Sequence, residues 1–289
     1  MREKSFLILG GTSFLGYQMY NFLKEKRVNV SATYYKNKGI NEFFKCNLLN
    51  YTSLNSLPKY DVVMLYAAYI VGKNKFKKNE QVINNVIKYV KKNNSFLVFI
   101  SSSQVKFLYD TEYKLSKIYS ENLIKKKLSN FLIIRPSLPF DNRNLASFNS
   151  TRQQPINFLI KLMKKYKFAP IIGNGKQTRQ PIYVDDLNLI VYEVLNLNIK
   201  PKIIEIGGPQ ILSYTEIISL ISDNLKIKVI KLHIPFTILL IISYFFNFID
   251  KDNLKNAVSS EKVDNKSWQE LSPSLKSLKL KKFFSKQII

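Results

Sequence analysis

Residues 5–16, Ser5-Phe6-Leu7-Ile8-Leu9-Gly10-Gly11-Thr12-Ser13-Phe14-Leu15-Gly16, are the stretch that decides the fold. The stretch opens with a short apolar run, which is typical of a parallel strand buried on both faces. Glycines follow the run, and residues 17–26 then show helical spacing. The sequence therefore predicts a strand, a tight turn and a helix, in that order.

Strand and helix patterns alternate along the rest of the first half of the chain. Short apolar runs predict strands at residues 28–33, 61–68, 96–100 and 130–134, and amphipathic spacing predicts helices at 80–92 and 113–127. Such alternation predicts an α/β fold of the Rossmann type, a doubly wound parallel sheet covered by helices on both faces.

Beyond Pro136 the pattern changes. Loop residues precede a predicted helix at 156–165, residues 180–186 predict a strand whose terminal aspartates cap a helix at 187–195, and residues 202–206 predict one more strand. We therefore predict a Rossmann domain of residues 1–139, to which 178–206 return. Residues 140–177 and 207–289 are predicted to form a smaller, mostly C-terminal α/β domain.

The amino-acid composition excludes some classes of function but does not identify one. The chain has 289 residues and a formal net charge of +25, which could indicate a nucleic-acid or anionic-membrane partner. Only six of the 45 cations are arginine, and the lysines are spread among many asparagines, as an AT-rich genome also produces. The single Cys46 and the single His233 leave no material for a disulfide, a metal cluster or serine-histidine chemistry. We expect a cytoplasmic protein with no metal site.

The first turn has the features of a dinucleotide-binding turn. Gly10 permits a tight exit from the strand, Gly16 lets the helix pack closely on the sheet, and the amino terminus of the helix can then face a pyrophosphate. Ser13 takes the middle position that is usually glycine, where it can cap the helix but also occupies space near a phosphate. The residues expected to contact the dinucleotide here are Gly10, Thr12, Ser13, Phe14, Leu15 and Gly16.

The ends of the next strands bear on the choice of cofactor. Thr33-Tyr34-Tyr35-Lys36 lacks the carboxylate that would hold the adenosine ribose, and Lys36 offers an ammonium instead, which favours NADP over NAD. Asn47 could hydrogen-bond the adenine edge or could serve only in a turn. Leu48, Ala67 and Ala68 complete the expected lining of the dinucleotide.

Tyr113 and Lys117 lie four residues apart in a predicted helix and therefore share a face. A nearby cation favours a phenolate, so such a tyrosine can exchange protons near neutral pH. Because the chain has 17 tyrosines and many lysines, the pair alone is a weak signal. The signal is stronger because the pair follows the glycine turn along the chain.

Taken in order, the motifs resemble the short-chain dehydrogenase/reductase superfamily, in its extended, sugar-nucleotide epimerase/dehydratase branch. The resemblance covers nearly the whole chain. It rests on the turn at 10–16, the strand at 61–63 with Ala67-Ala68, residues 100–105, Tyr113 with Lys117, residues 133–136, Arg179 with 183–186, and residues 205–208.

The resemblance implies a role for individual residues. Tyr113 would exchange the proton of a sugar hydroxyl or ketone, Lys117 would hold the nicotinamide ribose, and Ser102, with Ser103 as second choice, would orient the substrate oxygen. Ser103 and Gln104 stand where the dehydratases of the family carry an acidic pair, so dehydration is disfavoured. The list of residues expected to bind the substrate is Ser102, Ser103, Arg179 and Arg152, the two arginines being candidates for the substrate diphosphate.

The implied function is an NAD(P)-dependent oxidoreductase or epimerase acting at a ring carbon, C4, of a nucleotide-activated sugar, with a 4-keto reductase favoured over a 4-epimerase. The smaller domain would bind the sugar, and a homodimer is expected. Two alternatives stay open: a non-catalytic dinucleotide-sensing or RNA-binding protein, and a membrane-associated epimerase of a polyprenyl-diphosphate-linked sugar. Only ten residues separate Ser102 from Tyr113, so part of the usual substrate-facing wall is missing.

Phe236 to Phe246 is the most apolar stretch of the chain. With its extension to Ile249 it is about 14 residues long and falls short of the ~20 that a bilayer span requires. It predicts either a core helix of the smaller domain or an amphipathic anchor that lies on a membrane.

Overall fold

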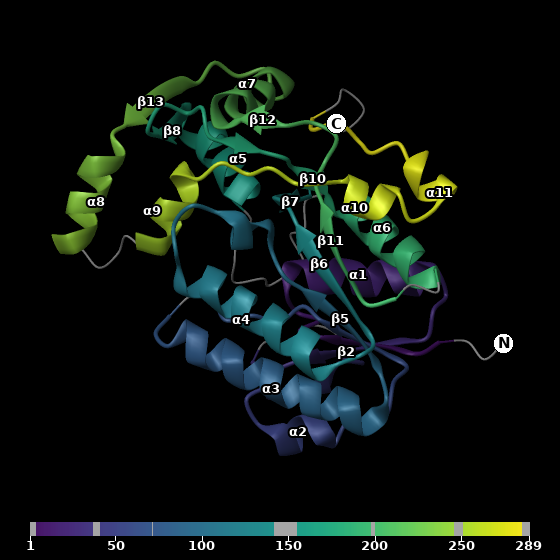
Figure 1. Cartoon of the computed structure of the whole chain (residues 1–289). Helices are drawn as coiled ribbons and strands as arrows, with labels where there is room; N and C mark the ends of the chain where they lie inside the picture. The colour runs from purple at the N-terminus through teal and green to yellow at the C-terminus, as the bar shows by residue number, and fades with distance from the viewer. Residues whose placement is uncertain are drawn as a thin grey trace.

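A computed structural model describes residues 4–36, 41–70, 72–141, 155–197, 200–245 and 251–284. Its centre is a parallel sheet of seven strands in the order β11-β6-β5-β4-β1-β2-β3 (Figure 1). This arrangement confirms the predicted Rossmann-type sheet. The strands are β1 (Phe6–Leu9), β2 (Val30–Tyr34), β3 (Phe44–Lys45), β4 (Val62–Leu65), β5 (Phe96–Ile100), β6 (Phe131–Pro136) and β11 (Lys202–Ile206).

Helices cover both faces of the sheet because alternate residues of each strand point to opposite sides. Ile8 of β1 lies in one core with residues of α1 (Phe14–Glu25) and α6 (Val184–Asn196). Leu7 lies in the other with α3 (Lys75–Asn93) and α4 (Glu112–Lys127), which pack side by side, and α2 (Tyr51–Asn55) packs on α3. Both faces of β1 are therefore buried, as its apolar run predicts.

The smaller part of the molecule is built around two parallel strands, β8 (Phe168–Ile172) and β13 (Ile230–Ile234). Its core joins them to α5 (Pro155–Tyr166) and α7 (Tyr214–Asn224). Two short strand pairs, β7 (Pro139–Phe140) with β10 (Ile182–Tyr183) and β9 (Thr178–Arg179) with β12 (Leu212–Ser213), link it to the Rossmann sheet.

The helix after β10 begins earlier than the sequence predicts. Tyr183 is the N-cap of α6, so Asp185 and Asp186 lie in its first turn and do not cap it. Carboxylates in the first turn still stabilise the helix, because they face the positive end of its dipole.

The C-terminal segment does not stay in the smaller part of the molecule. Trp268 of α10 (Lys266–Gln269) and Leu275 of α11 (Pro273–Lys276) are fully buried in the core between the sheet and α6. Asn265 fixes this return, since its side-chain oxygen accepts from the Gly207 amide at 2.9 Å and from the Trp268 indole at 3.2 Å. The structure thus differs from the prediction that all of 207–289 lies in the smaller domain.

The most apolar stretch forms α8 (Phe236–Phe245), which lies at the periphery beside α9 (Lys251–Val258) (Figure 1). Its described side chains do not belong to the core of the smaller part, and Ile238 and Ile241 are exposed. This differs from the predicted core helix. Within the described ranges, no helix combines the length and apolarity needed to cross a membrane.

Candidate active site

Ser13 stabilises the turn between β1 and α1 through hydrogen bonds within the turn. The Ser13 hydroxyl donates to the Gly10 carbonyl at 2.7 Å and accepts from the Gly16 amide at 3.1 Å, so it is the N-cap of α1. Gly10 has φ +91°, and a Cβ there would lie 2.7 Å from the Ala67 nitrogen. A Cβ on Gly16 would lie 2.3 Å from the Gly10 oxygen. Both glycines are therefore required by close packing.

The neighbouring strand ends support this turn. The Thr33 hydroxyl accepts from the Gly10 amide at 3.0 Å, and Lys36 follows β2 with an exposed side chain. Asn47 uses its side-chain oxygen in a local turn, accepting from the Leu49 amide at 3.1 Å. Its side-chain nitrogen lies 3.5 Å from the Tyr35 hydroxyl.

Lys117 is buried beneath Tyr113. α4 begins after its N-cap Thr111, and one turn separates the two side chains on the same face. The Lys117 Nζ donates to the Ile100 carbonyl at 2.6 Å and lies 5.6 Å from the centre of the Tyr113 ring. Burial lowers the pKa of Lys117 from 10.5 to about 7, against the opposing effect of Glu121. The structure thus brings the predicted pair together at the carboxyl end of β5.

Glu121 offsets only part of the effect of burial on the pKa of Lys117, because the Glu121 carboxylate is already paired with other groups. Its carboxylate accepts from Arg135 Nη2 at 2.6 Å and from the Ser101 hydroxyl at 2.5 Å. Arg135 also lies 3.3 Å from Glu205, its register partner on β11. The sequence analysis did not assign Glu121 or Glu205. Glu205 could have been identified by predicting that the strand that carries it pairs with the strand that carries Arg135.

The two candidate serines lie at the start of the short helix η1 (Ser103–Lys106). Ser102 is half-buried and caps η1 by accepting from the Gln104 amide at 3.2 Å. Ser103 is buried, and its hydroxyl donates to the carboxylate of Glu261. Of the two, Ser102 is therefore the more accessible.

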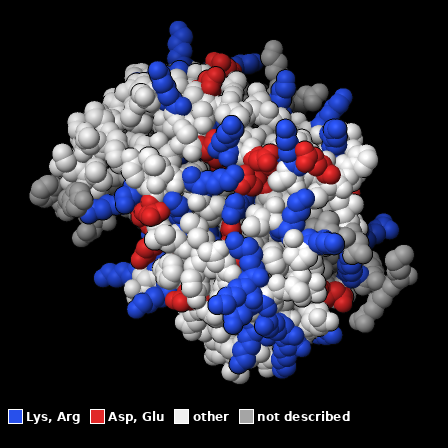
Figure 2. Space-filling view, viewed as in Figure 1, with Lys and Arg blue, Asp and Glu red and all other residues white. Residues whose placement is uncertain are grey.

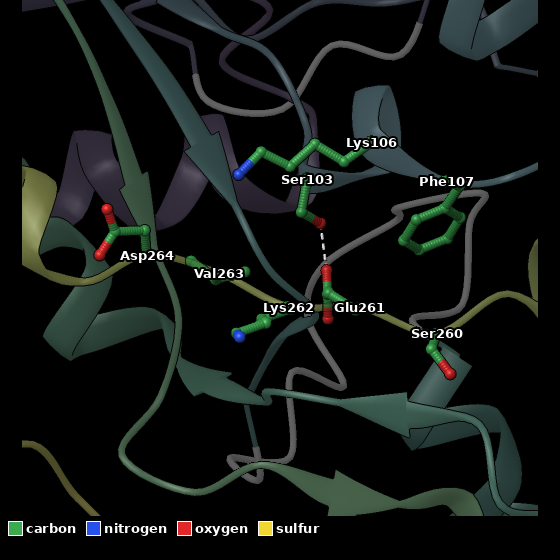
Figure 3. Close-up of a pocket in the computed structure, with 8 residues that line it drawn as sticks. All are labelled: Ser103, Lys106, Phe107, Ser260, Glu261, Lys262, Val263 and Asp264. Atoms are coloured by element: carbon green, nitrogen blue, oxygen red, sulfur yellow. Dashed lines mark hydrogen bonds between the residues drawn. The ribbon is translucent and has the colours of Figure 1, made fainter.

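A cavity of about 420 Å³ lies between η1 and the C-terminal segment 260–264 (Figure 3). Glu261 is buried in its wall, where its carboxylate also accepts from the Ser137 hydroxyl at 2.6 Å. Segment 260–264 supplies one wall of this cavity, and Ser103, Lys106 and Phe107 supply another. The lining residues are Ser103, Lys106, Phe107, Ser260, Glu261, Lys262, Val263 and Asp264.

Arg179 holds this C-terminal segment in place. Its Nη2 donates to the Asn256 carbonyl at 2.6 Å, and its Nη1 donates to the carbonyls of Thr178 and Ser259. The guanidinium lies over the Phe107 ring, and burial lowers its pKa. These donors are directed at backbone carbonyls in this structure, which differs from the expected diphosphate contact. Arg152, the second candidate, lies outside the described residues.

This order of strands and helices agrees with the comparison to known proteins. Residues 6–207 match the profile of the NAD dependent epimerase/dehydratase family. The chain belongs to this family. The resemblance inferred from the motifs is confirmed at this level.

Solved structures with the same fold include epimerases and a reductase. One is the ADP-L-glycero-D-manno-heptose-6-epimerase of Helicobacter pylori, with TM-score 0.66, 16% identity, and coverage of 96% of this chain and 97% of that one. Another is the dTDP-4-dehydrorhamnose reductase of Bacillus anthracis in complex with NADP, with TM-score 0.65, 18% identity, and coverage of 81% and 84%. The Thermus thermophilus UDP-glucose 4-epimerase complex with NAD has TM-score 0.64, 14% identity, and coverage of 80% and 86%.

Among curated proteins, this family member is similar to an Arabidopsis thaliana protein named NADH dehydrogenase [ubiquinone] 1 alpha subcomplex subunit 9, mitochondrial. The two are 26% identical over 125 residues, which is 43% of this chain and 29% of that protein. The match therefore spans less than a third of the relative.

Proposed function

We propose that this protein is an NAD(P)-dependent enzyme that reduces or epimerises a ring carbon, C4, of a nucleotide-activated sugar. The observation that carries the proposal is Lys117, buried beneath the Tyr113 ring at the carboxyl end of β5 with a pKa of about 7, in a chain whose residues 6–207 match the family. A buried lysine of this kind is costly to stability, and strongly perturbed groups concentrate at functional sites.

The turn fits a dinucleotide. The first-turn amides of α1 have no acceptor within the helix and point out of its amino end, where a pyrophosphate binds favourably. The Ser13 hydroxyl donates to the Gly10 carbonyl, so its hydrogen bond lies within the turn itself. The amides of Phe14 and Leu15 would hold the pyrophosphate, and Lys36 would bind an adenosine 2′-phosphate, which is why we propose NADP in preference to NAD.

A bound nicotinamide supplies or accepts the hydride. Tyr113 would give a proton to the sugar oxygen during ketone reduction, or take one from the hydroxyl during oxidation. Cationic Lys117 would favour the deprotonated phenol and hold the ribose, and Ser102 would orient the substrate oxygen. Ser103 and Gln104 cannot act as the acid and base of a dehydration, which leaves hydride transfer as the proposed chemistry.

We also propose a homodimer formed by α3 and α4. These helices pack against each other on one outer side of the sheet, below it in Figure 1. Two such pairs would make a four-helix interface.

The proposal is tested by Tyr113→Phe. After release and identification of any bound dinucleotide, the purified protein is assayed with a panel of nucleotide sugars for NADPH oxidation and isomer interconversion. Loss of the proton-exchanging hydroxyl should lower turnover by about 10²- to 10⁴-fold while dinucleotide affinity changes little. Tyr119→Phe, on the same helix, is the matched control. Near-normal turnover in Tyr113→Phe would reject the assignment, and dinucleotide binding without turnover of any sugar would favour a non-catalytic protein.

A further inference from the structure

The ribbon of β8 and β13 has one apolar face in the core and another that faces away from it. Ala169 and Ile171 are fully buried, so the alternate residues of β8 point to the opposite side. The parallel register places the apolar residues of β13 beside them, with Ile230 and Leu232 exposed to 73% and 50%. The residues paired on this outer face are Phe168 with Ile230, Pro170 with Leu232, and Ile172 with Ile234.

α8 continues this apolar surface. Ile238 and Ile241 are three residues apart on the same side of the helix and are exposed to 50% and 59%. The Tyr109 ring lies 6.3 Å from the ring of Phe236 at the start of α8. This contact brings Leu108, exposed to 81%, next to the helix.

The same surface begins at the candidate active site. Phe107 lines the cavity beside Glu261, and Leu108 and Tyr109 follow directly in the chain. We call the exposed residues Leu108, Ile230, Leu232, Ile238 and Ile241 the apolar shelf. It extends from the rim of the cavity along the lobe that carries β13 and α8.

Lysines lie beside the apolar shelf rather than on it. Lys226 and Lys228 precede β13 and are exposed, whereas Lys231 lies on the opposite face of β13 from Ile230 and Leu232, where its Nζ donates to the Ser219 hydroxyl at 2.8 Å. Figure 2 shows few charged side chains over the left lobe, where β13 and α8 lie, and many lysines over the rest of the viewed face. A second copy of this chain, which also has a net charge of +25, would be repelled, whereas an anionic lipid surface complements the lysines around the shelf.

We propose that the apolar shelf docks the protein on an anionic membrane surface. α8 has ten residues, which suits a helix lying in the interface with one side inserted among the acyl chains. If the proposed function holds, docking places the cavity beside the head groups, where a sugar carried on a lipid diphosphate would reach it. Docking itself does not depend on that chemistry.

The test is flotation of the purified full-length protein with vesicles of phosphatidylcholine alone and of equal parts phosphatidylcholine and phosphatidylglycerol. We expect binding to the anionic vesicles that weakens in high salt. The double variant Ile238→Glu/Ile241→Glu should bind at least about tenfold less, because it places two carboxylates on the inserted side. Lys226→Glu/Lys228→Glu should reduce binding to anionic vesicles, and Ile211→Glu, an exposed apolar position outside the shelf, should bind as the unaltered protein does.

Circular dichroism verifies that each variant is folded. The proposal is overturned if the unaltered protein stays with the soluble fraction, or if Ile238→Glu/Ile241→Glu binds vesicles equally well. A dimer in light scattering that this double variant dissociates would also overturn it, since the shelf would then be a self-association surface. Near-normal sugar turnover in Tyr113→Phe together with intact vesicle binding would overturn only the proposed enzymatic function.

Discussion

Replacing Lys117 by methionine should change the stability of the protein in opposite directions at low and high pH. Below about pH 7 the lysine is protonated in the folded and the unfolded chain, so the folded protein bears the full cost of a buried cation. Above that pH the folded protein releases the proton first. Its stability therefore rises until the unfolded chain also titrates, near 10.5.

The magnitude follows from the same values. A pKa that falls from 10.5 to about 7 corresponds to about 5 kcal/mol. Lys117→Met removes this cost at neutral pH but leaves the Ile100 carbonyl without its donor, which costs about 1–3 kcal/mol. The variant should thus be more stable than the unaltered protein by about 2–4 kcal/mol at or below neutral pH. Near pH 10.5 it should be less stable by about 1–3 kcal/mol.

Urea unfolding without added dinucleotide measures both differences. Trp268 is the single tryptophan and is fully buried, so its fluorescence reports loss of the core. Lys125→Met, at an exposed position of the same helix, should show no such dependence on pH. If Lys117→Met were less stable than the unaltered protein at neutral pH, or if the difference were equal at both pH values, the assignment of a buried, readily deprotonated lysine would be refuted.

Three further changes test other parts of the structure. Gly16→Ala would place a methyl group 2.3 Å from the Gly10 oxygen, so we expect a loss of about 1–3 kcal/mol in urea unfolding and at least tenfold weaker dinucleotide binding in calorimetry. Trp268→Ala should lower the free energy of unfolding by about 3–5 kcal/mol, followed by circular dichroism, and a change below 1 kcal/mol would contradict its role in the core of the sheet. Glu261→Gln removes the carboxylate that accepts from Ser103 and should cost about 1–3 kcal/mol, with a rise in KM larger than the fall in kcat; equal stability would show that the contact is not formed.

Local sequence patterns predict the Rossmann sheet because each signal lies within a few residues. The apolar run before Gly10 is buried on both faces, and the run at 96–100 coincides with β5. Tyr113 and Lys117 could be paired from sequence for the same reason, since one helical turn fixes their spacing. Roles inferred for them remain predictions.

Contacts between distant segments could not be predicted in the same way. Glu261 meets Ser103 across 158 residues of sequence, and no local pattern marks that approach. Arg179 was assigned to a diphosphate from its motif, yet its position beside segment 256–259 gives it carbonyl acceptors within the chain. The apolar character of α8 suggested a core helix, but hydrophobicity alone does not say which surface a helix covers.

The return of the C-terminal segment also sets the order in which this chain can finish folding. Until Trp268 and Leu275 have been synthesised and have left the ribosome, the region around β11 lacks both residues, and apolar surface stays open to water. A nascent chain that has already formed its parallel strands must therefore wait for residues 268–275 before this part of the core is covered. Truncations near residue 207, where the family match ends, should consequently aggregate during synthesis, and chaperone demand should be concentrated at this late stage.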